Sequence, residues 1–210
     1  MSPGISSNLP ARIANREDLR LFLELDLLAH GQTRWRVWHR VSRPTLHYQR
    51  ALRRVEYWTS RHDVIGRAIW VLARFRLARL SVRTGLSVPP GVFAPGLSIA
   101  HYGSIVVNDQ ARVGPFCRIH SATNIGSAQG EAPSVGSFVY IGPGAVLTGG
   151  VRVGDGVAIG ANSVVTRDCD AYATYAGAPA RKVSDKDSSS AMPKWISDLQ
   201  SRPAVIVEES

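Results

Sequence analysis

The sequence of 210 residues lacks the features that mark several classes of protein. Its only two cysteines, Cys117 and Cys169, lie far apart and have no histidines at ligand spacing, which argues against a disulfide framework and a zinc site and favours a reducing cytoplasm. The longest apolar run, Ala68–Ala73, is far shorter than the roughly 20 residues that a membrane span needs. Residues 1–10 contain no apolar core, so we expect no signal peptide.

Lysine is scarce in a chain whose formal net charge is nevertheless +9. Residues 1–85 contain 16 arginines, no lysine and 6 acidic residues, whereas residues 86–210 contain 9 basic and 10 acidic residues. Glycine has the opposite distribution, since 15 of its 19 positions lie between Gly91 and Gly177. The composition therefore predicts an α-helical N-terminal region over residues 1–88 and a different unit from residue 89 onward.

Residues 1–88 show apolar residues at helical spacing behind capping residues. Asn15 is the expected N-cap of a helix that ends at Gly31, and Asp63 is the expected N-cap of the last helix. Two further helices are expected over residues 34–41 and 45–59. The face of the last helix that is expected to point inward comprises Ile65, Ala68, Ile69, Leu72 and Phe75.

The arginine surplus of these helices allows three interpretations. The simplest is a solvated face on which arginine replaces lysine. The second is peripheral membrane contact, in which the Arg-rich region binds anionic lipid head groups. Nucleic-acid binding is disfavoured, because the sequence has no helix-turn-helix spacing and no RNP-like aromatic motif.

A six-residue repeat governs residues 105–166. A small or β-branched residue usually lies two positions before each aliphatic residue of the repeat, and glycine often follows it. This period fits neither a helix nor a hairpin sheet, and it predicts short strands that turn a corner every six residues and stack into a solenoid. Cys117 occupies a small inward position, which predicts a structural role. The aliphatic positions are Val107, Val113, Ile119, Ile125, Val135, Ile141, Leu147, Val153, Ile159 and Val165.

The repeat is the pattern of a left-handed parallel β-helix, and the chain resembles the hexapeptide-repeat acyltransferases. The resemblance is to the serine acetyltransferase family and to its relatives among bacterial surface-polysaccharide enzymes. Residues 96–107 resemble the segment around the catalytic histidine, residues 139–145 and 159–165 resemble the acetyl-CoA-binding coils, and residues 176–183 resemble the closing segment. The resemblance implies a β-helix domain over residues 89–183 with little more than three coils, assembled as a homotrimer. We expect residues 184–210 to form a flexible tail, because residues 184–190 are polar, although residues 195–199 could form a short docking helix within it.

The same resemblance implies acetyl transfer from acetyl-CoA to a hydroxyl group, without a metal and with His101 as the general base. Histidine suits this task because its ordinary pKa lies near neutral pH. The spacing of positions 101, 107 and 113 also allows His101 to be a buried residue of the first coil. Asp109 and His120 are candidates for binding the acceptor, although His120 is equally well interpreted as a surface residue. The candidate residues for binding acetyl-CoA are Gly142, Gly160, Ala161, Ala178, Arg181 and Lys182.

The sequence departs from the serine acetyltransferases around this histidine. The family has aspartate where this chain has Ala100, and a second aspartate near the position of Leu86. The hexads are interrupted by four extra residues within 126–133, which predicts a loop beside the active-site groove, but the family's histidine after that loop is missing. Asp109 or Glu131 could replace the missing carboxylates from a neighbouring coil or subunit.

These departures leave the acceptor open. Because the missing carboxylates also contact serine in the family, L-serine competes with a sugar hydroxyl of surface-polysaccharide biosynthesis. A non-catalytic trimeric scaffold is the alternative from another class. A β-helix carbonic anhydrase is set aside, since it needs three zinc-binding histidines and the repeat contains only His101 and His120.

Overall fold

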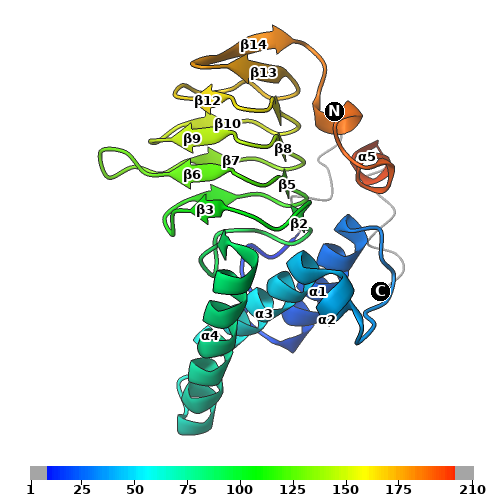
Figure 1. The fold of residues 1–210 in the computed structure, drawn as a ribbon, viewed down its shortest axis with the longest axis vertical. Helices are drawn as coiled ribbons and strands as arrows, with labels where there is room; N and C mark the ends of the chain where they lie inside the picture. The colour runs from blue at the N-terminus through cyan, green and yellow to red at the C-terminus, as the bar shows by residue number, and fades with distance from the viewer. Residues whose placement is uncertain (1–8, 202–210) are drawn as a thin grey trace.

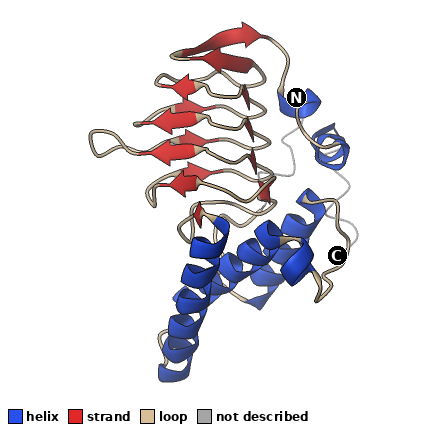
Figure 2. Ribbon diagram, viewed as in Figure 1, coloured by secondary structure: helices blue, strands red, loops and turns tan. Residues whose placement is uncertain are grey.

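The computed structural model describes residues 9–201. It consists of a stack of short strands with a group of helices at one end (Figures 1 and 2). The helical unit and the parallel β-helix that the sequence predicts are therefore both present. No helix in the described part of the chain is long and apolar enough to cross a membrane.

Side-chain caps fix the beginnings of two helices, as predicted. Asn15 accepts a hydrogen bond from the backbone N–H of Asp18, whose carboxylate accepts one from the backbone N–H of Asn15, and this capping box begins α1. Asp63 caps α4, which ends where Gly85 adopts a left-handed φ of 72°. The helices are α1 (Arg16–Ala29), α2 (His39–Ser42), α3 (Pro44–Thr59), α4 (Val64–Thr84) and α5 (Lys194–Ser201).

The helix expected over residues 34–41 is only the single turn α2. Its N-cap residue Trp38 makes no side-chain capping hydrogen bond, and Pro44 begins the next helix directly after Arg43. A short segment without a cap and bounded by proline has little to stabilise a longer helix.

The prediction for the inward face of the last helix was wrong. Ile65, Leu72 and Phe75 are exposed on α4, which instead buries Leu77 and Leu80. The reason is that α4 packs mainly against α3 and the first strand and projects away from the β-helix (Figure 1).

Three sheets form the faces of the β-helix, and we call them sheets A, B and C. Their strand orders are β1-β3-β6-β9-β12 in sheet A, β10-β7-β4 in sheet B and β14-β13-β11-β8-β5-β2 in sheet C. All strand pairs are parallel except β13 with β14, which forms an antiparallel hairpin at the far end. The strands are β1 (Leu86–Ser87), β2 (Ser98–Ile99), β3 (Ile105–Val107), β4 (Arg112–Val113), β5 (Arg118–Ile119), β6 (Asn124–Gly126), β7 (Ser134–Val135), β8 (Tyr140–Ile141), β9 (Val146–Thr148), β10 (Arg152–Val153), β11 (Ala158–Ile159), β12 (Val164–Val165), β13 (Thr174–Gly177) and β14 (Ala180–Ser184).

The β-helix has more coils than the sequence predicts. Sheet A contains five strands, because β1 starts the solenoid before residue 89 and a further coil precedes the regular hexads. In the first coil Ile99 pairs with Ile119, 20 residues later, whereas Ile141 pairs with Ile159, 18 residues later. The two extra residues of the first coil lie within the turn 100–104. Because of them, the inward positions of the first coil do not continue the six-residue spacing of the later coils.

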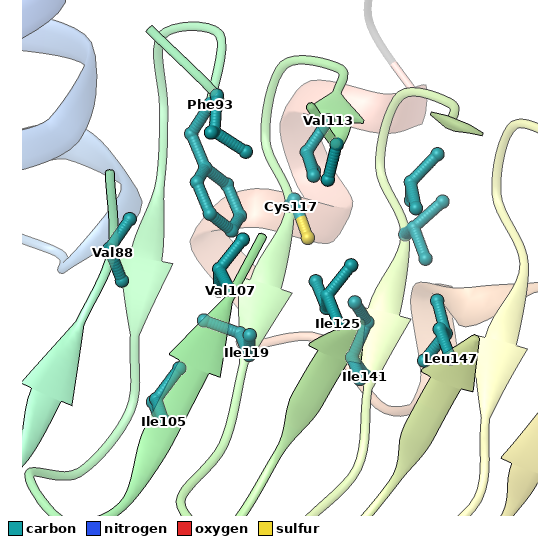
Figure 3. Close-up of a cluster of buried hydrophobic side chains, with 14 of the residues drawn as sticks. Val88, Phe93, Ile105, Val107, Val113, Cys117, Ile119, Ile125, Ile141 and Leu147 are labelled. Atoms are coloured by element: carbon teal, nitrogen blue, oxygen red, sulfur yellow. The ribbon is translucent and has the colours of Figure 1, made fainter. Parts of the chain in front are cut away.

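Inward side chains of all coils form one continuous hydrophobic core (Figure 3). Ile119, Ile125 and Ile141 are fully buried, as the hexad pattern predicts. Cys117 lies among them, and burial raises the pKa of its thiol, which fits the structural role expected for it. The same aliphatic columns therefore set the register of successive coils.

The segment after the β-helix packs against the rest of the chain, in contrast to the flexible tail expected over residues 184–210. A 3₁₀ turn, η2 (Ser188–Ser190), and α5 follow β14. The hydroxyl of Ser188 donates to the carbonyl of Phe138, and the indole N–H of Trp195 donates to the carbonyl of Ala29 at 3.1 Å. Ile196 is fully buried, so α5 ties the β-helix back to α1 and corresponds to the short docking helix expected over residues 195–199. Residues 202–210 of the expected tail lie outside the described residues.

A buried ion cluster joins α1 and α3 to the first coil. The guanidinium of Arg53 is fully buried and pairs with Asp26 at 2.9 Å and Glu56 at 3.0 Å. It also donates to the backbone carbonyls of residues 93–94, while Asp26 accepts hydrogen bonds from the backbone N–H groups of residues 96–97. Burial raises the pKa of Glu56, and the charge of Arg53 opposes that shift. The helical unit thereby fixes the backbone that leads into β2.

We predict that Arg53→Leu lowers the free energy of unfolding by about 3–5 kcal/mol, because it leaves two buried carboxylates without their partner. Urea unfolding followed by circular dichroism measures the change. The matched control is Arg54→Leu on the same helix, an exposed position with no ion pair to any described residue, which should change stability by less than about 0.5 kcal/mol. Equal effects of the two substitutions would contradict the role of the cluster.

Candidate active site

The turns that lead from sheet C to sheet A stack into one corner of the β-helix. His101 lies in the first of these turns, directly after β2. The pairing of β5, β8 and β11 places His120 beside Gly142 and Gly142 beside Gly160. This corner therefore brings together the candidate base, one acceptor candidate and two cofactor candidates from four coils.

His101 is exposed at this corner. Its ring centroid lies 6.0 Å from that of His120 in the next coil. The alternative in which His101 is a buried residue of the first coil is wrong, because Ile99 takes the inward position that pairs with Ile119. An exposed imidazole on an open corner is accessible to a substrate.

The turn that carries His101 rests on the end of α4. The backbone N–H of Gly103 donates to the carbonyl of Thr84 at 2.8 Å. A Cβ atom on Gly85 would lie only 2.9 Å from the carbonyl carbon of Gly103, so this approach requires glycine at position 85. The helix terminus thus supports the extra residues of the first turn.

His120 is half-buried between His101 and Tyr140, whose ring centroid lies 5.2 Å away. Burial, with smaller contributions from the charges of Arg118 and His101, lowers the pKa of His120 to about 4. Its imidazole is therefore neutral near pH 7 and offers one N–H donor and one acceptor nitrogen. His120 is thus a half-buried neighbour of the candidate base and not an isolated surface residue.

Arg118 and Tyr140 belong to the surroundings of His120 and were not predicted. Each precedes the inward aliphatic residue of a sheet C hexad, and the register of β5 and β8 pairs them. Arg118 donates to the hydroxyl of Ser98 at 2.8 Å, which holds the guanidinium against the neighbouring strand. Their equivalent positions in successive hexads were the signal in the sequence that could have identified them.

No carboxylate orients His101 within the described chain. Ala100 precedes it, Leu86 is fully buried in the core, and no hydrogen bond joins the His101 ring to any residue from 9 to 201. The two positions at which the family pattern has aspartate therefore hold apolar side chains, which cannot orient the imidazole.

The two remaining carboxylate candidates lie at a different corner. Asp109 is in the turn between β3 and β4, where it lines a cavity together with Arg12 and Arg112. Glu131 is in the loop between β6 and β7, which extends from the side of the solenoid (Figure 1). Within one chain the structure does not bring either residue to His101.

Small residues continue the corner beyond the two histidines. A Cβ atom on Gly142 would lie 2.8 Å from the backbone of the next coil, and one on Gly160 would lie 3.1 Å from a side chain of the coil after it. Ala161 and Ala178 are both exposed. The glycines therefore allow successive coils to stack closely, and the two alanines add only small side chains to the outside of the corner.

Arg181 and Lys182 lie on β14 of the closing hairpin, and both are exposed. Lys182 forms an ion pair with Asp185 at 2.6 Å, which raises the pKa of its ammonium group. Arg181 pairs with Ala176 across the hairpin, and its side chain donates to the carbonyl of Ala180. Arg181 therefore has no carboxylate partner among residues 9–201, whereas the charge of Lys182 is compensated by Asp185.

The residues that could ligate a metal are dispersed. Among residues 9–201 no three histidine, cysteine or acidic side chains gather in a geometry that could hold a metal ion.

Comparisons with known proteins identify relatives of this chain. The family model described as bacterial transferase hexapeptide (six repeats) matches residues 132–167. The serine acetyltransferase of Synechococcus elongatus is 31% identical over 137 residues, which cover 62% of this chain and 53% of that protein. That of Helicobacter pylori strain J99 is 34% identical over 124 residues, which cover 57% of this chain and 68% of that protein. The chain thus spans about half to two thirds of the length of these relatives.

Solved structures show the same similarity. A serine acetyltransferase in complex with cysteine matches with a TM-score of 0.66 and 26% identity over 80% of this chain and 71% of that chain. A complex with CoA matches with a TM-score of 0.63 and 25% identity over the same shares. The left-handed parallel β-helix predicted from the hexads is confirmed.

The solenoid and the matched repeat define a hexapeptide-repeat acyltransferase. Within that class, the chain belongs to the serine acetyltransferase family.

We predict that His120 titrates near pH 4 in the folded protein. Because the unfolded chain binds this proton at a higher pH, near 6.5, stability contributed by neutral His120 is present above that value and is lost as the pH falls toward 4. NMR titration of the imidazole resonances, assigned with His120→Gln, measures the midpoint. A midpoint above about 6 would contradict the burial of this ring between its neighbours.

Proposed function

We propose that this protein is an acetyl-CoA-dependent O-acetyltransferase in which His101 is the general base. The observation that carries the proposal is the exposed His101 beside neutral His120, at a corner that continues as a wall of small residues. The relatives are named serine acetyltransferases, and one of their solved structures contains CoA, which supports the same chemistry here.

The proposed reaction is direct transfer. The acceptor hydroxyl loses its proton to His101 as its oxygen attacks the thioester carbonyl of acetyl-CoA. The tetrahedral intermediate then collapses, the carbon–sulfur bond breaks, and the leaving thiolate takes the proton back from the imidazolium. A neutral His120 suits this sequence, because it can hydrogen-bond the acceptor without placing a second positive charge beside the imidazolium that forms.

Acetyl-CoA is proposed to lie along the corner of the β-helix. Gly142 and Gly160 allow successive coils to approach closely, and the small exposed side chains of Ala161 and Ala178 leave room along the same edge for its pantetheine arm. The exposed cations of residues 181–182 are suited to bind its phosphates. Because this co-substrate is an intracellular metabolite, we propose a cytoplasmic location.

L-serine is the acceptor that the relatives favour, since one solved relative is a complex with serine. That structure matches with a TM-score of 0.65 and 25% identity over 80% of this chain. A sugar hydroxyl of surface-polysaccharide biosynthesis is the second candidate. It is favoured by Ala100 and Leu86, which leave the corner without a carboxylate to bind an amino group.

We further propose that the chain acts as a homotrimer. Asp109 and Glu131 lie at a corner away from His101, so a carboxylate from them can reach the base only from a neighbouring subunit. The mass measured by light scattering at micromolar concentration should be about three times the 22.8 kDa of one chain. A monomeric mass would contradict the proposal.

We predict that His101→Ala lowers kcat by about 10²–10⁴-fold, the usual contribution of a general base. Because His101 is exposed, the melting temperature and the trimeric mass should remain those of the wild type. Release of the free CoA thiol measures kcat. An intact trimer with near-normal turnover would exclude His101 as the base, whereas a folded wild type without any turnover would favour a non-catalytic scaffold.

We predict that Ala161→Leu raises the KM for acetyl-CoA about tenfold or more, because a larger side chain occupies part of the space in which the pantetheine arm is proposed to lie. The matched control is Ala171→Leu, the same enlargement at an exposed position on the corner between sheets B and C. Initial rates at varied acetyl-CoA compare the two. Equal KM values for both variants would place the cofactor elsewhere.

A further inference from the structure

The outer face of α4 is apolar and uncovered. We define the α4 outer face by six side chains that are each more than half exposed, although none is polar. α4 packs against α3 on its other side and projects from the end of the molecule (Figure 1). An uncovered face of this kind on one helix marks an interaction surface. The six residues are Val64, Ile65, Val71, Leu72, Phe75 and Val82.

Arginines flank this face, and α4 contains no acidic residue. At 100° per residue, Arg67 and Arg74 border one side of the apolar stripe and Arg76 and Arg83 border the other, whereas Arg79 lies within the stripe, over the ring of Phe75. No ion pair joins any of these five arginines to a carboxylate of residues 9–201. The positive charge of α4 is therefore uncompensated within the described chain.

The exposed apolar side chains and the arginines without carboxylate partners together decide which partner fits the α4 outer face. A second copy of α4 would bury apolar side chains but would bring arginine against arginine, with no carboxylate on either helix. An anionic lipid surface complements both properties, because its acyl boundary takes the apolar side chains and its phosphates take the guanidinium groups. The helix would lie on such a surface, since it lacks the apolar length to cross a bilayer.

We propose that the α4 outer face binds the surface of an anionic lipid bilayer, with Phe75 and Leu72 at the acyl boundary and the flanking arginines at the phosphates. This binding does not depend on acetyl transfer. It nevertheless bears on the site, because the carbonyl of Thr84 at the end of α4 holds the turn of His101 through Gly103.

Vesicle flotation of the full chain tests the proposal. We expect binding to vesicles of phosphatidylcholine with about a third phosphatidylglycerol, weaker binding at high salt, and little binding to phosphatidylcholine alone. The double variant Leu72→Glu with Phe75→Glu should bind at least about tenfold more weakly. Each of Arg67→Gln and Arg79→Gln should weaken binding about fivefold. Thiol release with a soluble acceptor should be the same in all of these variants.

The matched control is Val41→Glu, which adds one carboxylate at an exposed apolar position of the helical unit outside α4. It should bind vesicles nearly as the wild type does, and circular dichroism should show the same helix content in all variants. Equal binding to neutral vesicles, or equal loss in the control, would overturn the proposal. The proposal would also be overturned if the wild type did not bind vesicles and the double variant lowered the mass in light scattering. The α4 outer face would then bind another copy of the chain.

Discussion

The buried guanidinium of Arg53 is the constraint on which the arrangement of the molecule depends. A solenoid exposes the core of its first coil unless another element covers it. Here α1 and α3 provide that cover, and Arg53 joins Asp26, Glu56 and the backbone of residues 93–94 in one network of direct hydrogen bonds and ion pairs. A buried polar network is stable only when each charge has its partner. Any other placement of the helices on the first coil would separate these partners, so the network fixes the position of the helices.

The position of the candidate base follows from this cover. The backbone held by Asp26 leads directly into β2, and the next turn carries His101 outward over the end of α4. The regular hexads then supply the rest of the corner, first His120 and afterwards residues without bulky side chains. The base and the proposed cofactor wall therefore come from different parts of the fold, one supported by the helices and the other by the repeat.

The hexad period predicted the β-helix, its core columns and the stacking of Gly142 on Gly160, because each depends only on local spacing. Asn15 and Asp63 were predicted as N-caps for the same reason. The first coil was mispredicted, since its turn has two extra residues, and this error also gave His101 its alternative buried position. The contact between Asp26 and Arg53 and the packing of α5 on α1 have no periodic signal, because they join residues far apart in the chain.

We propose that this corner transfers an acetyl group from acetyl-CoA to a hydroxyl, and that reaction can be tested directly. The most direct measurement is free-thiol release by the purified protein with acetyl-CoA and a panel of acceptors, namely L-serine and nucleotide-linked or lipid-linked sugars, with the acetylated product identified by mass spectrometry. If acetyl transfer occurs at this corner, we expect thiol release that requires one of these acceptors and yields its O-acetyl ester. A folded protein that binds acetyl-CoA but releases no thiol with any acceptor would contradict it.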